Sequence, residues 1–171
     1  MMLNTLLTAG LLLIAAGIHA ADKKTDGAID STAAFARLKT LVGEWEADTS
    51  MGKARVTYEL IAGGSSLVER ESAERMPAMM TVYHMDGNRL LLTHYCMAGN
   101  QPRMQAQTFD PKKGEVQFRF LDATNMVRHD AIHMHNATFR ILDKDHFTSD
   151  WELYENGQRK TKESFHYARV R

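Results

Sequence analysis

Residues Gly114-Glu115-Val116-Gln117-Phe118-Arg119-Phe120 alternate polar and apolar side chains, and this alternation decides the fold class. Successive side chains of a β-strand point to opposite faces, so such a segment buries one face and leaves the other in water. The same pattern extends from Glu44 almost to the C-terminus, with Gly, Asn, Asp or Pro turns at intervals of about 8 to 12 residues. The sequence therefore predicts an all-β domain of short strands.

Ten strands are expected between these turns, at residues 43–49, 53–62, 65–73, 79–86, 89–97, 103–110, 114–121, 131–142, 145–154 and 160–170. Because the links are short, consecutive strands are expected to pair antiparallel. A meander of this length removes its open edges most simply by closing on itself. We therefore predict a single closed antiparallel meander barrel of about ten strands.

A short helix is expected before the first strand. Asp30 or Ser31 can cap its start, and Gly43 follows its end. Its apolar residues recur at helical spacing, at Phe35, Leu38, Leu41 and Val42.

The first 21 residues contain no Asp, Glu, Lys or Arg and centre on an apolar run at residues 11–16. This composition is typical of a secretory signal peptide, with cleavage expected after Ala20 or Ala21, although no Lys or Arg precedes the run. An uncleaved membrane anchor is the alternative, but the apolar stretch is shorter than the roughly 20 residues that a spanning helix needs. We expect a signal peptide at 1–21, a flexible leader at 22–30 and the barrel domain at 31–171. We therefore expect a periplasmic or secreted protein that has no stable membrane span after cleavage.

The charges balance, with 21 Lys and Arg against 21 Asp and Glu, and no basic stripe is present. This argues against nucleic acid as a partner. Cys96 is the single cysteine, so an internal disulfide is impossible. Its thiol is an apolar filler, a ligand or a reactive group.

The apolar face of each strand is expected to line the barrel interior. Its members are Trp45, Ala47, Val56, Tyr58, Leu60, Val116, Phe118, Phe120, Phe147, Trp151, Leu153, Phe165 and Tyr167. The opposite face is expected in water and includes Glu44, Glu46, Arg55, Glu59, Gln117, Arg119, Asp150, Glu152 and His166.

Two pairs of ligand-type side chains fall on the inner face by the same alternation. His94 and Cys96 share the parity of Leu90 and Leu92, and His133 and His135 share that of the apolar residues after them. The imidazoles of His94, His133 and His135, or two of them with a thiolate, suggest a tetrahedral zinc site in the lumen with one open position. Soft ligands combined with imidazole also suit copper. Sulfur is available from Met79, Met80, Met85, Met97, Met104 and Met134. The alternative is that these histidines are buried and hydrogen-bonded, and that the methionines fill gaps.

Other inner or rim residues suggest contacts to a small ligand. Arg103 is expected to clamp a carboxylate, unless its segment is simply a turn. The lumen wall would include Tyr58, Tyr83 and Trp151. Glu69 and Glu71 share the parity of Leu67; either they point inward, where burial and mutual repulsion would raise their pKa values, or that strand is twisted with both faces wet.

The segment Leu41-Val42-Gly43-Glu44-Trp45, followed by an all-β meander and a terminal Arg169 or Arg171, resembles the calycin superfamily of lipocalins, fatty-acid-binding proteins and nitrobindin-like domains. The resemblance implies that Trp45 closes one barrel end and that Arg169 packs across its indole. Nitrobindin-like domains hold haem through a histidine near the C-terminus. His166 is the candidate here, but its parity places it outside the barrel.

These observations predict an exported barrel that binds a small apolar or amphipathic molecule in its lumen, through His94, Cys96, Arg103, His133, His135, Tyr58, Trp151 and Tyr83. A binding protein is favoured over an enzyme. The alternative is a metal- or haem-binding barrel that uses the lumen histidines, with redox or hydrolytic activity.

Overall fold

The computed structural model describes residues 29–50 and 52–171. The signal peptide expected at 1–21 and most of the leader lie outside these residues. Within them, the chain forms a helix α1 (Ser31–Lys39), a 3₁₀ turn η1 (Ala62–Gly64) and ten strands. The strands are β1 (Gly43–Thr49), β2 (Gly52–Ile61), β3 (Ser66–Ala73), β4 (Met76–Asp86), β5 (Arg89–Tyr95), β6 (Gln101–Asp110), β7 (Glu115–Thr124), β8 (His133–Ile141), β9 (His146–Glu155) and β10 (Gln158–Arg169).

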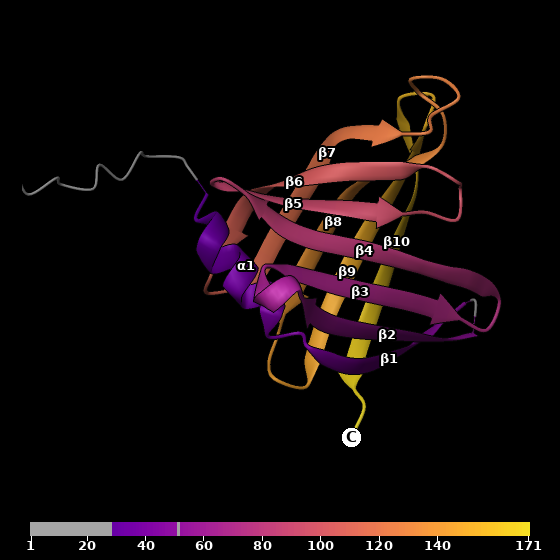
Figure 1. The fold of residues 1–171 in the computed structure, drawn as a ribbon. Helices are drawn as coiled ribbons and strands as arrows, with labels where there is room; N and C mark the ends of the chain where they lie inside the picture. Colours follow the sequence, from indigo (N-terminus) through magenta and orange to yellow (C-terminus); the bar gives the residue numbers. More distant parts are fainter. Residues whose placement is uncertain (1–28, 51) are drawn as a thin grey trace, which may run out of the picture.

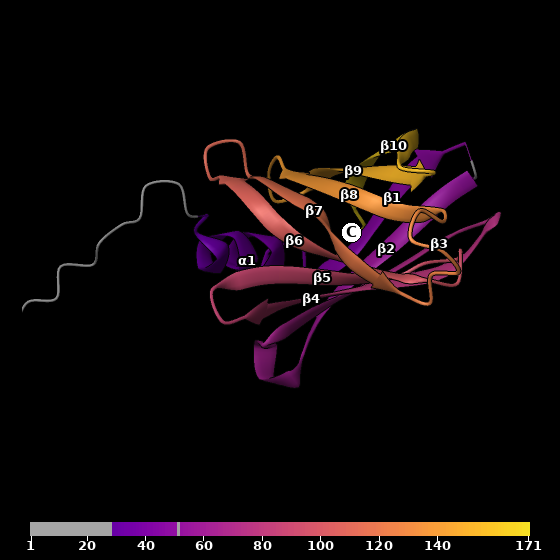
Figure 2. The same ribbon diagram turned by 90° about the horizontal axis from the view of Figure 1, so that it is seen from above.

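Each strand pairs antiparallel with its neighbours in the sequence, and β1 pairs with β10, so the sheet is a closed barrel. The predicted closed meander is confirmed. Helix α1 lies at one end of the barrel, and the β5–β6 and β7–β8 loops lie at the other (Figures 1 and 2). No helix in the described part of the chain has the length and apolar character needed to cross a membrane.

The N-terminus of α1 is capped by Asp30, whose carboxylate accepts a hydrogen bond of 2.9 Å from the Ala33 N–H. Phe35 and Leu38 are buried on the inner side of the helix. Arg37 donates a hydrogen bond of 2.7 Å to the Ile141 carbonyl. The helix is thereby fastened over its end of the barrel.

The junction between α1 and β1 is built around Trp45 and Arg169. The guanidinium carbon of Arg169 lies 4.0 Å from the centre of a Trp45 ring, and Trp45 Nε1 donates to the Leu41 carbonyl at 2.7 Å. Gly43 has a φ of +130°, and a Cβ there would collide with Nη1 of Arg169. The Gly-x-Trp spacing therefore has a steric cause: glycine leaves room for the arginine that covers the indole.

The half of the barrel next to α1 is filled by its own side chains. Trp45 packs edge-on against Phe147 with ring centroids 4.9 Å apart, and Phe118 and Phe139 meet Tyr83 in similar geometry. Ten of the thirteen residues predicted to face inward are buried. Phe120 and Leu153 are half-buried, and Leu60 is exposed near the end of β2.

The outer face carries an ion network that the alternation pattern did not predict. Asp150, expected in water, is buried by Arg140, Lys162 and Ser164, which contact its carboxylate at 2.8, 3.0 and 2.6 Å. Desolvation by burial acts to raise the pKa of Asp150, but these three partners outweigh it and lower the pKa to about 2. Long polar side chains on neighbouring strands have covered a residue that still points away from the lumen.

The barrel is closed by few paired residues where β1 meets β10. Strand β1 pairs with β10 only at Trp45↔Arg169 and Glu46↔Ala168, whereas β9 and β10 stay paired from Gln158 to Ala168 apart from one bulge. Beyond Glu46 the two strands separate.

Candidate functional site

Two adjoining cavities lie at the barrel end opposite α1. The larger, about 290 Å³, is called the mouth pocket and is lined by Met76, Met79, Cys96, Met97, Ala98, Ile132, Met134, Leu153 and Glu163. The smaller, about 20 Å³, is called the inner cavity and is lined by Glu71, Met76, Met79, His94, Met134, Trp151, Glu163 and Phe165. Three methionines and Glu163 belong to both, so the two form one site with an apolar entrance and a more polar floor.

His94 is the most unusual polar group of the floor. Its Nδ1 lies 2.9 Å from Thr81 Oγ1, and its Nε2 is buried without a hydrogen-bond partner among the described residues. Burial lowers the pKa of His94 to about 4, so the ring is neutral at physiological pH. A buried polar atom of this kind usually has a partner, because leaving it unpaired costs about 1–3 kcal/mol.

Cys96 lies two residues after His94, just beyond the end of β5, and lines the mouth pocket beside Met97. Its thiol is half-buried, and burial raises its pKa, although a backbone hydrogen bond from Ala98 acts in the opposite direction. A protonated thiol of this kind behaves as a small apolar group. His94 lines the inner cavity and Cys96 lines the mouth pocket, in agreement with the inward orientation expected for both; that either residue binds a ligand stays a prediction.

His133 and His135 lie elsewhere, which corrects the predicted lumen triad of His94, His133 and His135. The pairing of β8 with β9 shifts between Met134 and Asn136. This bulge inserts one residue and reverses the alternation before it, so Met134 reaches the inner cavity. Neither histidine is among the described residues that line the two cavities.

The two displaced histidines form an aromatic cluster of their own. The His135 ring stacks between Tyr154 and Phe120, with centroid distances of 4.1 and 4.8 Å. His133 joins it through a contact of 2.9 Å between its Nε2 and His135 Nδ1, and its own Nδ1 lies 2.7 Å from the Ala131 carbonyl. Each ring nitrogen of His133 thus has a polar partner on or next to β8. This agrees with the alternative stated above, that these histidines are buried and hydrogen-bonded.

Arg103 does not reach the cavities either. Its side chain is exposed and forms a two-pronged ion pair with Asp122, in which Nε lies 2.6 Å from Oδ1. The residue therefore joins β6 to β7 on the outer surface, and the predicted carboxylate clamp is not present. Asn100, another rim residue, donates a hydrogen bond of 2.7 Å to the Ile132 carbonyl and holds the β5–β6 loop against the segment before β8.

Glu69 and Glu71 are both buried inside the barrel, and Glu71 lines the inner cavity. Tyr83 donates a short hydrogen bond to Glu69, and Tyr167 donates to Glu71 at 2.9 Å. Burial and the charge of Glu71 raise the pKa of Glu69 to about 8, although the Tyr83 and Tyr58 hydroxyl groups oppose this. Burial also raises the pKa of Glu71, against the Tyr167 hydrogen bond. Tyr58 and Tyr83 therefore interact with the buried carboxyl group of Glu69, and neither tyrosine lines the mouth pocket or the inner cavity.

The positions of the described histidines do not fit the ligation of haem. His166 is exposed on the outer face of β10, as its parity predicted. The part of the site that touches His94 has about the size of one water molecule, so a macrocycle cannot reach the imidazole in this arrangement. Among residues 29–50 and 52–171, no three His, Cys, Asp or Glu side chains converge as a metal site.

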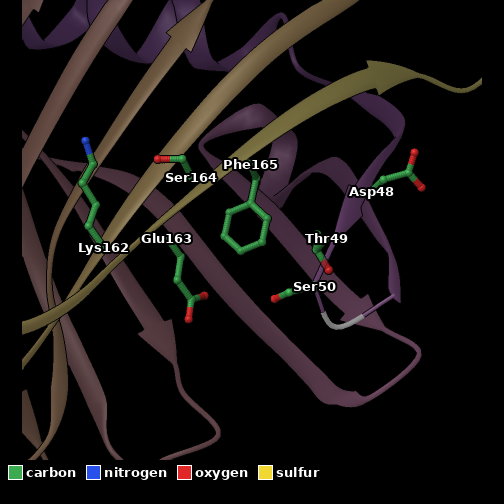
Figure 3. Close-up of a pocket in the computed structure, with 7 residues that line it drawn as sticks. All are labelled: Asp48, Thr49, Ser50, Lys162, Glu163, Ser164 and Phe165. Carbon is green, nitrogen blue, oxygen red and sulfur yellow. The ribbon is translucent and has the colours of Figure 1, made fainter.

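A side groove of about 500 Å³ adjoins the site where β1 and β10 separate. It is lined by Asp48, Thr49, Ser50, Lys162, Glu163, Ser164 and Phe165. Glu163 and Phe165 project from one face of β10, and Lys162 and Ser164 project from the other (Figure 3). Glu163 and Phe165 line both this groove and the inner cavity, so the groove borders the site.

The sequence-based reasoning missed Met76, the inward position of Met134, and Glu163. Met76 preceded the predicted start of its strand, and Glu163 lies on a strand whose first half is polar on both faces. The clustering of methionines at residues 76, 79 and 80 was a usable signal, because thioether side chains adapt to irregular cavities.

No protein-family model and no curated protein matches the chain. Among solved structures, a protein of unknown function from the DUF3598 family of Nostoc punctiforme PCC 73102 is similar in fold, with a TM-score of 0.53 and 12% sequence identity. The similarity covers 78% of this chain and 48% of that chain, so this chain spans about half the length of that protein. At this identity the similarity shows the barrel fold and nothing about a ligand.

Proposed function

We propose that this protein is a calycin-type barrel, exported by its first 21 residues, that binds a small and largely apolar molecule in the mouth pocket. The observation that carries the proposal is the pocket itself: about 290 Å³, open at one end and lined mainly by methionine, leucine, isoleucine and alanine. Ligand pockets have this composition, with few polar groups that fix orientation. The volume is near the lower end of the usual range and fits a small molecule better than a long-chain lipid.

Two polar groups at the floor would orient the ligand. His94 Nε2 is an unpaired buried atom that a hydroxyl or carbonyl group can satisfy, and Glu163 stands at the boundary with the side groove. The methionines suit this role because their unbranched side chains repack around ligands of different shape. The half of the barrel near α1 is filled by aromatic side chains, so the bound molecule would stay at the mouth.

The test is the binding of the fluorescent apolar probe N-phenyl-1-naphthylamine to the purified protein. Met97→Glu places a carboxylate in the mouth pocket, and Leu142→Glu is the matched control on the β8–β9 turn at the other end. The two side chains have similar exposure, 62% and 58%. The Met97 variant is expected to weaken probe binding by roughly tenfold or more, because it places a charge in an apolar site. Saturable binding that both variants leave unchanged would locate the ligand elsewhere, and absence of saturable binding would contradict the proposal.

A further inference from the structure

The inner cavity is lined by an unusual set of donors. Three thioether side chains, Met76, Met79 and Met134, share it with the imidazole of His94. These residues come from β4, β8 and β5, so strands on opposite sides of the barrel bring them together. Ordinary hydrophobic packing accounts for the methionines but leaves the buried, unpartnered Nε2 of His94 unexplained.

The chemical class of these donors selects the ion that they could hold. Thioether sulfur is a soft, uncharged ligand that favours Cu(I), and imidazole accepts copper as well. Calcium and magnesium require several oxygen ligands, and structural zinc sites use thiolate, imidazole or carboxylate donors. A set of three thioethers and one imidazole therefore points to a soft monovalent cation.

The surroundings of His94 suit a metal ligand. When Nδ1–H donates to Thr81 Oγ1, at 2.9 Å, the lone pair of Nε2 is free for an ion. A histidine that binds a metal usually makes a hydrogen bond of this kind with its second nitrogen, which holds the ring in place. Thr81 itself is buried and lies directly opposite His94 in the β4–β5 pairing.

Charge and size agree with a single small cation. The cavity volume of about 20 Å³ is that of one water molecule or one ion. The Trp151 ring lies beside His94 and lines the cavity, and an aromatic face attracts cations. Glu71 and Glu163 also line it and can offset a positive charge that the neutral donors do not.

We propose that the inner cavity is a Cu(I) site, in which the thioethers of Met76, Met79 and Met134 and Nε2 of His94 hold one ion beneath the mouth pocket. Binding of the ion does not require an apolar ligand; while Cu(I) occupies Nε2 of His94, that nitrogen is not available to orient a ligand in the mouth pocket, and Glu163 is the polar group that remains. Binding involves no change of oxidation state, because the ion enters and leaves as Cu(I).

The first experiment is anaerobic competition for Cu(I) between the purified protein and bicinchoninate. One ion per chain is expected to move to the protein. Leucine replaces methionine with little change of volume, so the triple variant Met76→Leu/Met79→Leu/Met134→Leu is expected to fold. Loss of direct ligands costs at least the roughly 10- to 100-fold in affinity that loss of an outer partner costs, so the triple variant is expected to lose more than that.

Two controls separate the proposed site from other sulfur groups. Met104→Leu changes a buried methionine outside both cavities and is expected to leave the affinity for Cu(I) unchanged. Cys96→Ser removes the thiol of the mouth pocket and is also expected to leave it unchanged. If the cysteine variant loses Cu(I) binding and the triple leucine variant keeps it, the ion sits on the thiol and the proposal is wrong.

A second measurement needs no variant. Ag(I) is a redox-inert substitute for Cu(I), and it is expected to shift the methyl NMR signals of Met76, Met79 and Met134 but not that of Met104. Binding of N-phenyl-1-naphthylamine to the triple variant distinguishes the two proposals, since the leucines keep the pocket apolar. Retained probe binding with lost Cu(I) binding supports both proposals; no transfer of Cu(I) from bicinchoninate to the wild-type protein overturns the metal site alone.

Discussion

The imidazole of His94 lies against the indole of Trp151, with ring centroids 5.0 Å apart and planes tilted by 40°. His94 is on β5 and Trp151 is on β9, and three strands separate them around the barrel. Their contact therefore crosses the lumen. It separates the aromatic core near α1 from the methionine-lined cavities at the other end, so this pair forms the floor of the candidate site.

The hydrogen bond between Thr81 and His94 is expected to stabilise this floor. Thr81→Val removes the hydroxyl with almost no change of shape and leaves a second ring nitrogen of His94 without a partner. We expect the free energy of unfolding, measured by urea denaturation, to fall by about 1–3 kcal/mol. Thr93→Val is the control, because Thr93 lies next to His94 on the opposite face of β5. Equal effects of the two substitutions would show that the hydrogen bond is not the cause.

Stability should decrease as the pH rises from about 6.5 to 8. Burial raises the pKa of Glu69 to about 8, from an ordinary value of 4.5, so in this range the folded protein holds a proton that the unfolded chain has released. The free energy of unfolding then falls by up to about 1.4 kcal/mol per pH unit. Below pH 6.5 the lowered pKa of His94 makes the free energy of unfolding rise with pH. The decrease caused by Glu69 is therefore clearest above pH 6.5.

Glu69→Gln is expected to flatten this dependence, because glutamine cannot release a proton. Glu59→Gln, on the exposed face of β2, is the control and should keep the wild-type slope. The measurement is a series of urea denaturation curves between pH 6.5 and 8. A wild-type protein whose stability rises with pH over this range would contradict the assignment of a protonated Glu69.

Arg169 is expected to fasten the two ends of the barrel sheet. Its guanidinium group covers Trp45 and donates to the carbonyls of Val42 and Lys144 at 2.9 and 2.8 Å. Arg169→Leu should lower the free energy of unfolding by about 2 kcal/mol, since it removes the cation–π contact and these hydrogen bonds. Arg171→Leu, which removes only an exposed ion pair with Asp145, should change it by less than about 0.5 kcal/mol. Thermal or urea unfolding of both variants checks the difference.

The two histidine regions should respond differently in a ligand assay. His94→Ala enlarges the floor of the site and removes its polar group, so the affinity for N-phenyl-1-naphthylamine should change. His133→Ala disturbs the cluster with His135 and Phe120, so stability should fall while probe affinity stays the same. A loss of affinity in a folded His133 variant would mean that β8 positions the ligand more directly than the cavity lining indicates.

Strand number, strand order and closure followed from the chain's local pattern. Alternation across segments such as 114–120 requires one buried face, and short turns permit only antiparallel neighbours. The same reasoning placed His94 and Cys96 on the inner face through their parity with Leu90 and Leu92, whereas the contact between Trp45 and Arg169 was expected only from the resemblance to calycins. The features that the pattern predicted are properties of single strands or of adjacent ones, so the local sequence is sufficient to predict them.

For Glu69 and Glu71, the alternation of side chains along β3 did not decide whether they point into the barrel or into water. Leu67 and Val68 are both buried, so the alternation on β3 does not reveal which face is inside. The inward position of the carboxyl groups depends on hydroxyl partners from Tyr83 and Tyr167, which lie 14 and 96 residues away in the sequence. A buried polar group is acceptable only where such partners exist, and their presence is a property of the assembled barrel.

Periodicity and turn chemistry act within a few residues, and they were enough to predict a closed meander barrel preceded by a short helix. The residues that line the cavity depend instead on contacts between strands that are distant in the sequence. The bulge between Met134 and Asn136 exchanges histidine for methionine on the inner face, and it is visible only in the pairing with β9. The meeting of His94 with Trp151 and the methionines likewise depends on how opposite walls of the barrel approach each other, which no single strand encodes.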